Sequence, residues 1–224
     1  MQEGLHEIAT LADIDRDGAI QETFEEAGGD TRAAFFRKGA MVAGGGLALG
    51  AFPAGFALAQ GVPKGDRKIL NFALTLEYLE AAFYEEAIAK GKLTGETALF
   101  AQVVGAHEAA HVEALKAALG VKAVGKPSFD FQGTTGSEKS FRKTAMVLED
   151  TGVSAYQGQA PRIKTTAVLA SAGAILAVEA HHAAWIRDII GGGKGVNPAP
   201  GAFNKAMSMD EVLAAVKDTK FIKS

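Results

Sequence analysis

Two patterns of acidic, phenolic and imidazole side chains each occur twice in this chain. Glu77 is followed seven residues later by Tyr84, and Glu149 is followed at the same distance by Tyr156. A Glu-x-x-His motif then follows each pair at a nearly equal separation. These motifs are Glu108 with His111 and Glu179 with His182. Because an α-helix turns once in 3.6 residues, positions i, i+3 and i+7 project from one face. The repeat therefore indicates two equivalent halves that present metal-ligating groups.

Four helices are needed to position these groups, and the apolar periodicity with its caps predicts them. They are expected from Asp66, taken as an N-cap, to Lys90, from Thr94 to Gly120, from Ser137 to about Gly158, and from Thr165 to Ile190. A turn is expected at 163–165, with Pro161 in the last turn of the third helix. The fourth helix carries one formally charged residue, Glu179, up to Ile186, which predicts burial on all sides. A short helix in the tail is expected after the capping box of Ser208 and Glu211.

In antiparallel hairpins, residues equidistant from the turn lie at the same level. Six side chains are therefore expected to converge in one layer of the core: Glu77, Glu108, His111, Glu149, Glu179 and His182. Buried carboxylates are costly unless they are paired, and no Lys or Arg stands on the matching faces. Two divalent cations would balance the four carboxylates and leave the imidazoles neutral. Oxygen and imidazole donors suit iron or manganese, although zinc would also bind.

Several neighbouring residues have alternative interpretations. Glu80 lies three residues after Glu77 and could be the ligand in its place. The tyrosine repeat favours Glu77, because Gly152 stands at the corresponding position after Glu149. Tyr84 and Tyr156 are expected either as core aromatics or as hydrogen-bond donors to ligand carboxylates. His107 and His181 have no counterparts in the other half, which favours positions beside the ligands or on the surface.

Composition excludes several classes of protein. An apolar fraction of 48% is sufficient for a packed core. The net charge of −3 lacks the basic excess of a nucleic-acid-binding protein. The chain has no cysteine, which excludes disulfides, thiolate zinc sites and iron–sulfur clusters.

The N-terminal part has the features of a targeting segment rather than of a folded domain. Residues 1–30 form an acidic leader, and residues 31–62 combine a basic start, an uncharged stretch and the small-x-small sequence Ala57-Leu58-Ala59. The basic start resembles a twin-arginine signal with Ala33 in place of the second arginine. We expect export to the periplasm; the alternatives are an uncleaved membrane anchor, a linker, and a cytoplasmic protein.

Residues 71–80 (NFALTLEYLE) and 178–185 (VEAHHAAW), together with the repeat, resemble the ferritin-like di-iron carboxylate superfamily, and most closely exported bacterial proteins related to plant desiccation-related proteins. The resemblance implies an all-α antiparallel four-helix bundle over 63–190, with 121–135 as a long crossover between the second and third helices. Residues 191–224 form a tail with a short helix. The resemblance also implies two iron ions, or manganese or a mixed pair, with Glu108 and Glu179 as bridges and Glu77 and Glu149 as terminal ligands.

The function that this resemblance implies is redox chemistry in stress protection. Fe(II) would be oxidised, or peroxide or O2 consumed, and the metal ligands would carry any oxidoreductase activity. One alternative is a non-catalytic desiccation-protective protein with a structural metal site, and another is a manganese catalase-like enzyme. We expect a homodimer or higher homo-oligomer, no nucleic-acid partner, and membrane contact only through an uncleaved N-terminal segment.

Overall fold

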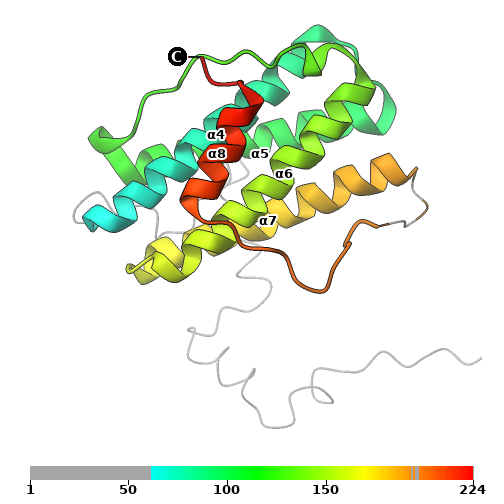
Figure 1. Cartoon of the computed structure of the whole chain (residues 1–224). Helices are drawn as coiled ribbons and strands as arrows, with labels where there is room; N and C mark the ends of the chain where they lie inside the picture. Colours follow the sequence, from blue (N-terminus) through cyan, green and yellow to red (C-terminus); the bar gives the residue numbers. More distant parts are fainter. Residues whose placement is uncertain (1–61, 193, 195–196, 224) are drawn as a thin grey trace, which may run out of the picture. The chain divides into compact units, whose positions relative to one another are not determined.

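The computed structural model describes residues 62–192, 194 and 197–223. The acidic leader and nearly all of the export-signal-like segment, residues 1–61, lie outside the described residues. The described part contains helices α4 (Lys64–Lys90), α5 (Gly95–Leu119), α6 (Glu138–Gln159), α7 (Thr166–Gly191) and α8 (Met209–Thr219), and it contains no strand (Figure 1). The prediction of an all-α four-helix bundle with a short C-terminal helix is confirmed.

Two helical hairpins build the bundle, α4 with α5 and α6 with α7. Gly91 ends α4 in the left-handed conformation, where glycine avoids the steric cost of a Cβ. Pro161 lies in a 3₁₀ helix (Ala160–Arg162) after α6, and not in the last turn of α6 as predicted. A proline ring disfavours continuation of the α-helical hydrogen bonds, so the chain tightens there before the turn at 163–165.

The start of α4 differs from the sequence prediction. The helix begins at Lys64, and Pro63 is its N-cap residue, so Asp66 lies in the first turn. The Asp66 carboxylate instead accepts hydrogen bonds from the backbone N–H groups of Lys164 and Thr165, at 3.0 and 2.9 Å. This acid therefore fastens the start of one hairpin to the turn of the other.

The crossover between the hairpins is held along its length. The Asn71 side chain donates to the carbonyl of Lys122 and accepts from the backbone N–H of Val124. Further along, an isolated antiparallel bridge joins Phe129 to Ile222 near the C-terminus. The hydrogen bonds attach the start of the crossover to α4, and the bridge attaches its later part to the C-terminal tail.

The C-terminal helix is part of the core. The predicted capping box of Ser208 and Glu211 is present at the start of α8. Val212 and Val216 are buried in the same hydrophobic cluster as the stacked rings of Phe83 and Phe141. Burial of these side chains supplies the free energy that holds α8 on the bundle.

Helix α7 is not buried on all sides, so that prediction is wrong for the described structure. Leu169 is 39% exposed, and small residues on the same side, such as Ala170, Gly173 and Ala174, are also exposed. By length and composition the helix could cross a membrane, and 39% of its most apolar stretch of 18 residues is buried. A helix of a four-helix bundle has neighbours on one side only, so its outer face stays uncovered within a single chain.

Candidate metal centre

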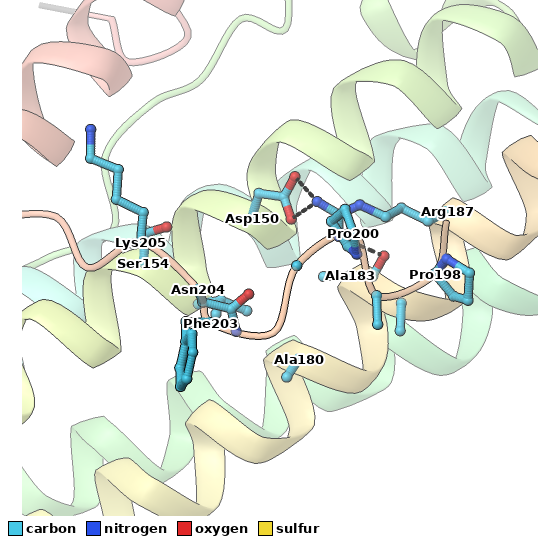
Figure 2. A pocket seen from close by; sticks show the side chains of 14 residues that line it. Asp150, Ser154, Ala180, Ala183, Arg187, Pro198, Pro200, Phe203, Asn204 and Lys205 are labelled. Carbon is cyan, nitrogen blue, oxygen red and sulfur yellow. Dashed lines mark hydrogen bonds and ion pairs between the residues drawn. The ribbon is translucent and has the colours of Figure 1, made fainter. Parts of the chain in front are cut away.

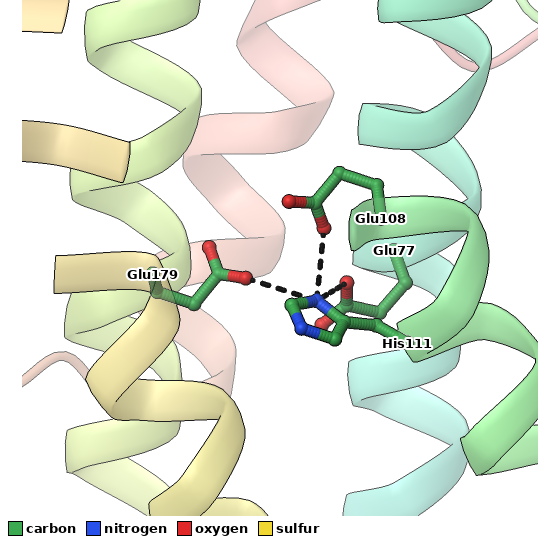
Figure 3. A group of neighbouring side chains, drawn as sticks. All are labelled: Glu77, Glu108, His111 and Glu179. Atoms are coloured by element: carbon green, nitrogen blue, oxygen red, sulfur yellow. Dashed lines mark hydrogen bonds and ion pairs between the residues drawn. The ribbon is translucent and has the colours of Figure 1, made fainter. Parts of the chain in front are cut away.

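Four glutamates and two histidines from α4, α5, α6 and α7 meet inside the bundle. Their ligand atoms form two groups, and within each group these atoms lie within 4.8 Å of one another. One group is Glu77, Glu108, His111 and Glu179, and the other is Glu108, Glu149, Glu179 and His182. Figure 3 shows the first group, in which Glu179 from α7 and the residues of α4 and α5 point toward one another. Glu108 and Glu179 belong to both groups, so they lie between two adjacent groups that could each hold a metal ion.

The cluster is shielded from solvent. All four glutamates are fully buried, and His182 is 2% exposed. The His111 side chain is slightly more accessible, at 11%. The spacing in the sequence explains this arrangement, since Glu and His at i and i+3 share one helix face, and that face is turned inward in both α5 and α7.

The electrostatics of the cluster show that its negative charges lack compensation. Burial raises the pKa of Glu108 and of Glu179 well above the usual range, and the charges of the neighbouring glutamates raise it further. Burial alone would lower the pKa of His111, but the nearby carboxylates, led by Glu77, outweigh burial and raise it. For Glu77, burial is in turn outweighed by His111, so its pKa is lowered. His111 Nδ1 lies close to three carboxylates at once. It is 3.1 Å from Glu77, 3.2 Å from Glu108 and 3.3 Å from Glu179.

Three carboxylate oxygens of the two shared residues are buried without a hydrogen bond to any described residue: Glu108 Oε1, Glu179 Oε1 and Glu179 Oε2. Two of them still face an imidazole nitrogen, since His182 Nδ1 lies 3.1 Å from Glu108 Oε1 and His111 Nδ1 lies 3.3 Å from Glu179 Oε1. Glu179 Oε2 has no such contact among the described residues. Unpartnered buried polar atoms cost free energy unless an ion or water occupies the space between them. All three oxygens belong to the two residues that the ligand groups share. The set of oxygen and imidazole donors therefore fits divalent metal ions.

Two tyrosines support the outer carboxylates reciprocally. The Tyr84 hydroxyl on α4 donates to Glu149 on α6, and the Tyr156 hydroxyl on α6 donates to Glu77 on α4. Burial and the adjacent carboxylates raise the pKa of both phenols well above the ordinary value, so they remain protonated donors. Each hydrogen bond fixes one carboxylate and ties the two hairpins together.

The two histidines of the cluster differ in their support. His182 Nδ1 faces Glu108 and Glu149 at 3.1 and 3.2 Å. Its Nε2 lies 2.9 Å from His107 Nδ1. Burial, followed by the neighbouring histidines, lowers the pKa of His107, so a neutral His107 ring can accept a hydrogen bond from the N–H at His182 Nε2. His107 therefore orients His182 with Nδ1 toward the carboxylates, whereas His181 is exposed.

Glu80 is also in the interior, next to Glu77 rather than in its place. It is 3% exposed but belongs to neither of the two ligand groups. Its i+3 spacing from Glu77 was the available sequence signal: it places both acids on one helix face, although the prediction treated them as alternatives for a single ligand.

A separate surface pocket of about 550 Å³ lies outside the ligand layer, between α6, α7 and the segment 198–205. An ion pair between Asp150 and Arg187 crosses it (Figure 2). Asp150, Ala180 and Ala183 directly follow three of the cluster residues in sequence, so they point about 100° away around their helices. None of the six cluster residues lines the pocket.

The described residues form a four-helix bundle in which each helix supplies a carboxylate, and α5 and α7 each supply a histidine, to two adjacent groups that could hold metal ions. The chain belongs to the ferritin-like family, whose domain pattern, the ferritin-like domain, matches residues 65–192. The family resemblance predicted from the sequence is thus confirmed. No curated protein matches the chain.

Proposed function

We propose that this chain binds two iron ions, or manganese or a mixed pair, and uses them to oxidise Fe(II) or to consume peroxide or O2. Glu108 and Glu179 would bridge the pair, Glu77 and Glu149 would be terminal ligands, and the imidazoles of the cluster would complete the two sites. The observation that carries this proposal is the sharing of two buried carboxylates, with oxygens that lack hydrogen bonds, between the two ligand groups.

When bound, such a pair would give two electrons to hydrogen peroxide, which takes up two protons and becomes two molecules of water. The residues of the protein would hold the two ions and shield them from solvent. The two shared carboxylates set the spacing of the cation positions, and Tyr84 and Tyr156 keep the outer carboxylates in place. The dry interior strengthens each of these interactions, because charges interact more strongly at low dielectric.

The test is a combined metal count and activity assay. Reconstituted protein should bind two ions per chain, and aerobic addition of Fe(II) should produce ferric absorbance faster than in buffer alone. Glu179→Gln should lower the stoichiometry and the rate. Glu85→Gln is the matched control, since Glu85 lies on α4 with 77% of its side chain exposed. Wild-type protein that binds no metal would refute the proposal.

The same assay separates the alternatives from the sequence. A protein that binds two ions but neither oxidises Fe(II) nor consumes peroxide would be the stress-protective protein with a structural metal site. Peroxide disproportionation by the manganese form alone would indicate the catalase-like enzyme.

Export and self-association are further proposals. The exposed apolar side of α7 is suited to a second copy of the chain, because small residues allow close helix packing. Light scattering of the purified protein tests for a dimer or larger oligomer, and N-terminal sequencing of protein from its native host tests for cleavage after the export-signal-like segment.

A further inference from the structure

Glu80 is a fifth buried carboxylate beside the four of the proposed centre. It lies one turn after Glu77 on α4 and is 3% exposed. The influences on its pKa act in one direction: burial raises it most, and the charge of Glu179 is next, followed by Glu108, Glu149 and Glu77. A carboxylate buried among other carboxylates is costly, so its position requires an explanation beyond packing.

The residue opposite Glu80 makes room for it. Gly152 is three residues after Glu149 on α6, so it occupies the place in the second half that Glu80 occupies in the first. A Cβ on Gly152 would lie 2.6 Å from Glu179 Oε2 and 3.5 Å from Glu80 Oε1. The missing side chain therefore lets the Glu179 carboxylate lie close to the backbone of α6, with Glu80 Oε1 near the same point.

The Glu179 oxygen near this point is itself without a partner. Glu179 is fully buried, and its Oε2 forms no hydrogen bond with any described residue. This oxygen belongs to a carboxylate shared by both ligand groups. A cation bound to it on the side of Gly152 would have Glu80 nearby, because Glu179 Oε2 and Glu80 Oε1 both lie within 3.5 Å of the position that a Gly152 Cβ would take.

We propose that Glu80 is a seventh protein ligand of the metal pair. Glu80 would bind a metal ion on the Gly152 side, next to the bridging Glu179. The inference rests on the proposed function, because it needs the pair to be bound. The two halves of the site are then unequal, since the second half has glycine where the first has a carboxylate.

The negative charge of Glu80 should affect the relative stability of the divalent and trivalent states of the metal pair. Four carboxylates neutralise two divalent ions, and a fifth leaves one negative charge in excess. Oxidation of one or both ions to the trivalent state removes that excess. Glu80 should therefore stabilise the oxidised pair relative to the divalent pair.

The test uses Co(II), whose visible absorption strengthens as its coordination number falls. Wild type, Glu80→Gln, Glu80→Asp and the control Glu85→Gln are loaded with Co(II), and ion count, affinity and absorption per bound ion are measured. Glu80→Gln should still bind two ions, with one bound roughly 10- to 100-fold more weakly and with stronger absorption. Glu80→Asp keeps the charge but shortens the side chain, so it should also change the spectrum. Glu85→Gln should match wild type.

Three outcomes overturn the inference. If Glu80→Gln and Glu80→Asp match wild type in affinity and spectrum, Glu80 is not a ligand, and the metal centre itself stands. If Glu80→Asp alone restores the wild-type spectrum, only the charge of Glu80 matters. If wild-type protein binds no Co(II), Fe(II) or Mn(II), the proposed centre fails together with the inference. A positive shift of the iron midpoint potential in Glu80→Gln would support the charge argument, and an unchanged potential would contradict it.

Discussion

Replacing Gly152 by alanine should separate the stability of the fold from the integrity of the metal centre. The added Cβ would lie 2.6 Å from Glu179 Oε2 and 3.4 Å from its Cδ. Ordinary contact begins at 3.4 Å, so the carboxylate must withdraw. Because Glu179 is shared by the two ligand groups, its displacement should weaken both cation positions.

Gly152→Ala should keep or raise the stability of the metal-free protein and should lower its affinity for metal. In metal-free protein the Glu179 carboxylate is the end of a flexible side chain and can move aside. Alanine in the interior of a helix is favoured over glycine by about 1 kcal/mol, so Gly152→Ala should keep or raise the free energy of unfolding of the metal-free form. Metal–oxygen distances tolerate changes of only about 0.2 Å. We therefore expect a loss of metal affinity of about 10- to 100-fold, where each factor of ten corresponds to about 1.4 kcal/mol.

Urea denaturation of metal-free and Mn(II)-loaded protein, with chelator competition for the dissociation constant Kd, measures both effects. Gly173→Ala is the matched control, because Gly173 is also inside a helix and a Cβ there would meet nothing within 4 Å. It should stabilise both forms and leave Kd unchanged. If Gly152→Ala binds Mn(II) as tightly as wild type, the placement of Glu179 at the shared position is refuted.

Three further predictions concern the supports of the centre, its charge and the tail. Tyr84→Phe and Tyr156→Phe should each weaken metal binding by about tenfold, because each removes a charge-assisted hydrogen bond from a carboxylate worth roughly 1.5–3 kcal/mol; chelator competition measures this, and equal Kd values in wild type and both variants would contradict it. Metal-free protein should lose stability as pH rises above 4.5, since the raised pKa values of Glu108 and Glu179 mean that the folded chain holds protons which the unfolded chain has released. Metal-loaded protein should show the opposite trend, because binding displaces those protons. The midpoint of urea denaturation is measured at pH 5 and pH 8, once with EDTA and once with Mn(II), and a change with pH in the same direction in both would contradict the prediction. Gly158→Ala would place a Cβ 1.8 Å from the Met207 carbonyl oxygen, so the tail should detach and stability should fall by about 1–3 kcal/mol with Kd unchanged. Unaltered proteolysis of the tail would contradict that reasoning.

The sequence predicted the helices well because their signals are local. Apolar periodicity, the Ser137 and Ser208 caps and the glycines at the helix ends all act within a few residues. Where a residue acts across the bundle, local reasoning was wrong. Asp66 was predicted to cap its own helix, whereas its carboxylate holds the turn before α7.

The repeat of Glu-x6-Tyr and Glu-x-x-His determined by itself which faces of the four helices carry ligating groups, because helical periodicity fixes which side chains share a face. The symmetry of the hairpins also predicted that these groups converge in one layer, but only the tertiary structure decided how they are arranged within it. It assigned Glu108 and Glu179 to both ligand groups and joined each tyrosine to the carboxylate of the opposite hairpin. It also showed that Glu80 points inward beside Gly152. These relations depend on the rotation and register of one helix against another, which packing of the whole core sets and no single stretch of sequence contains.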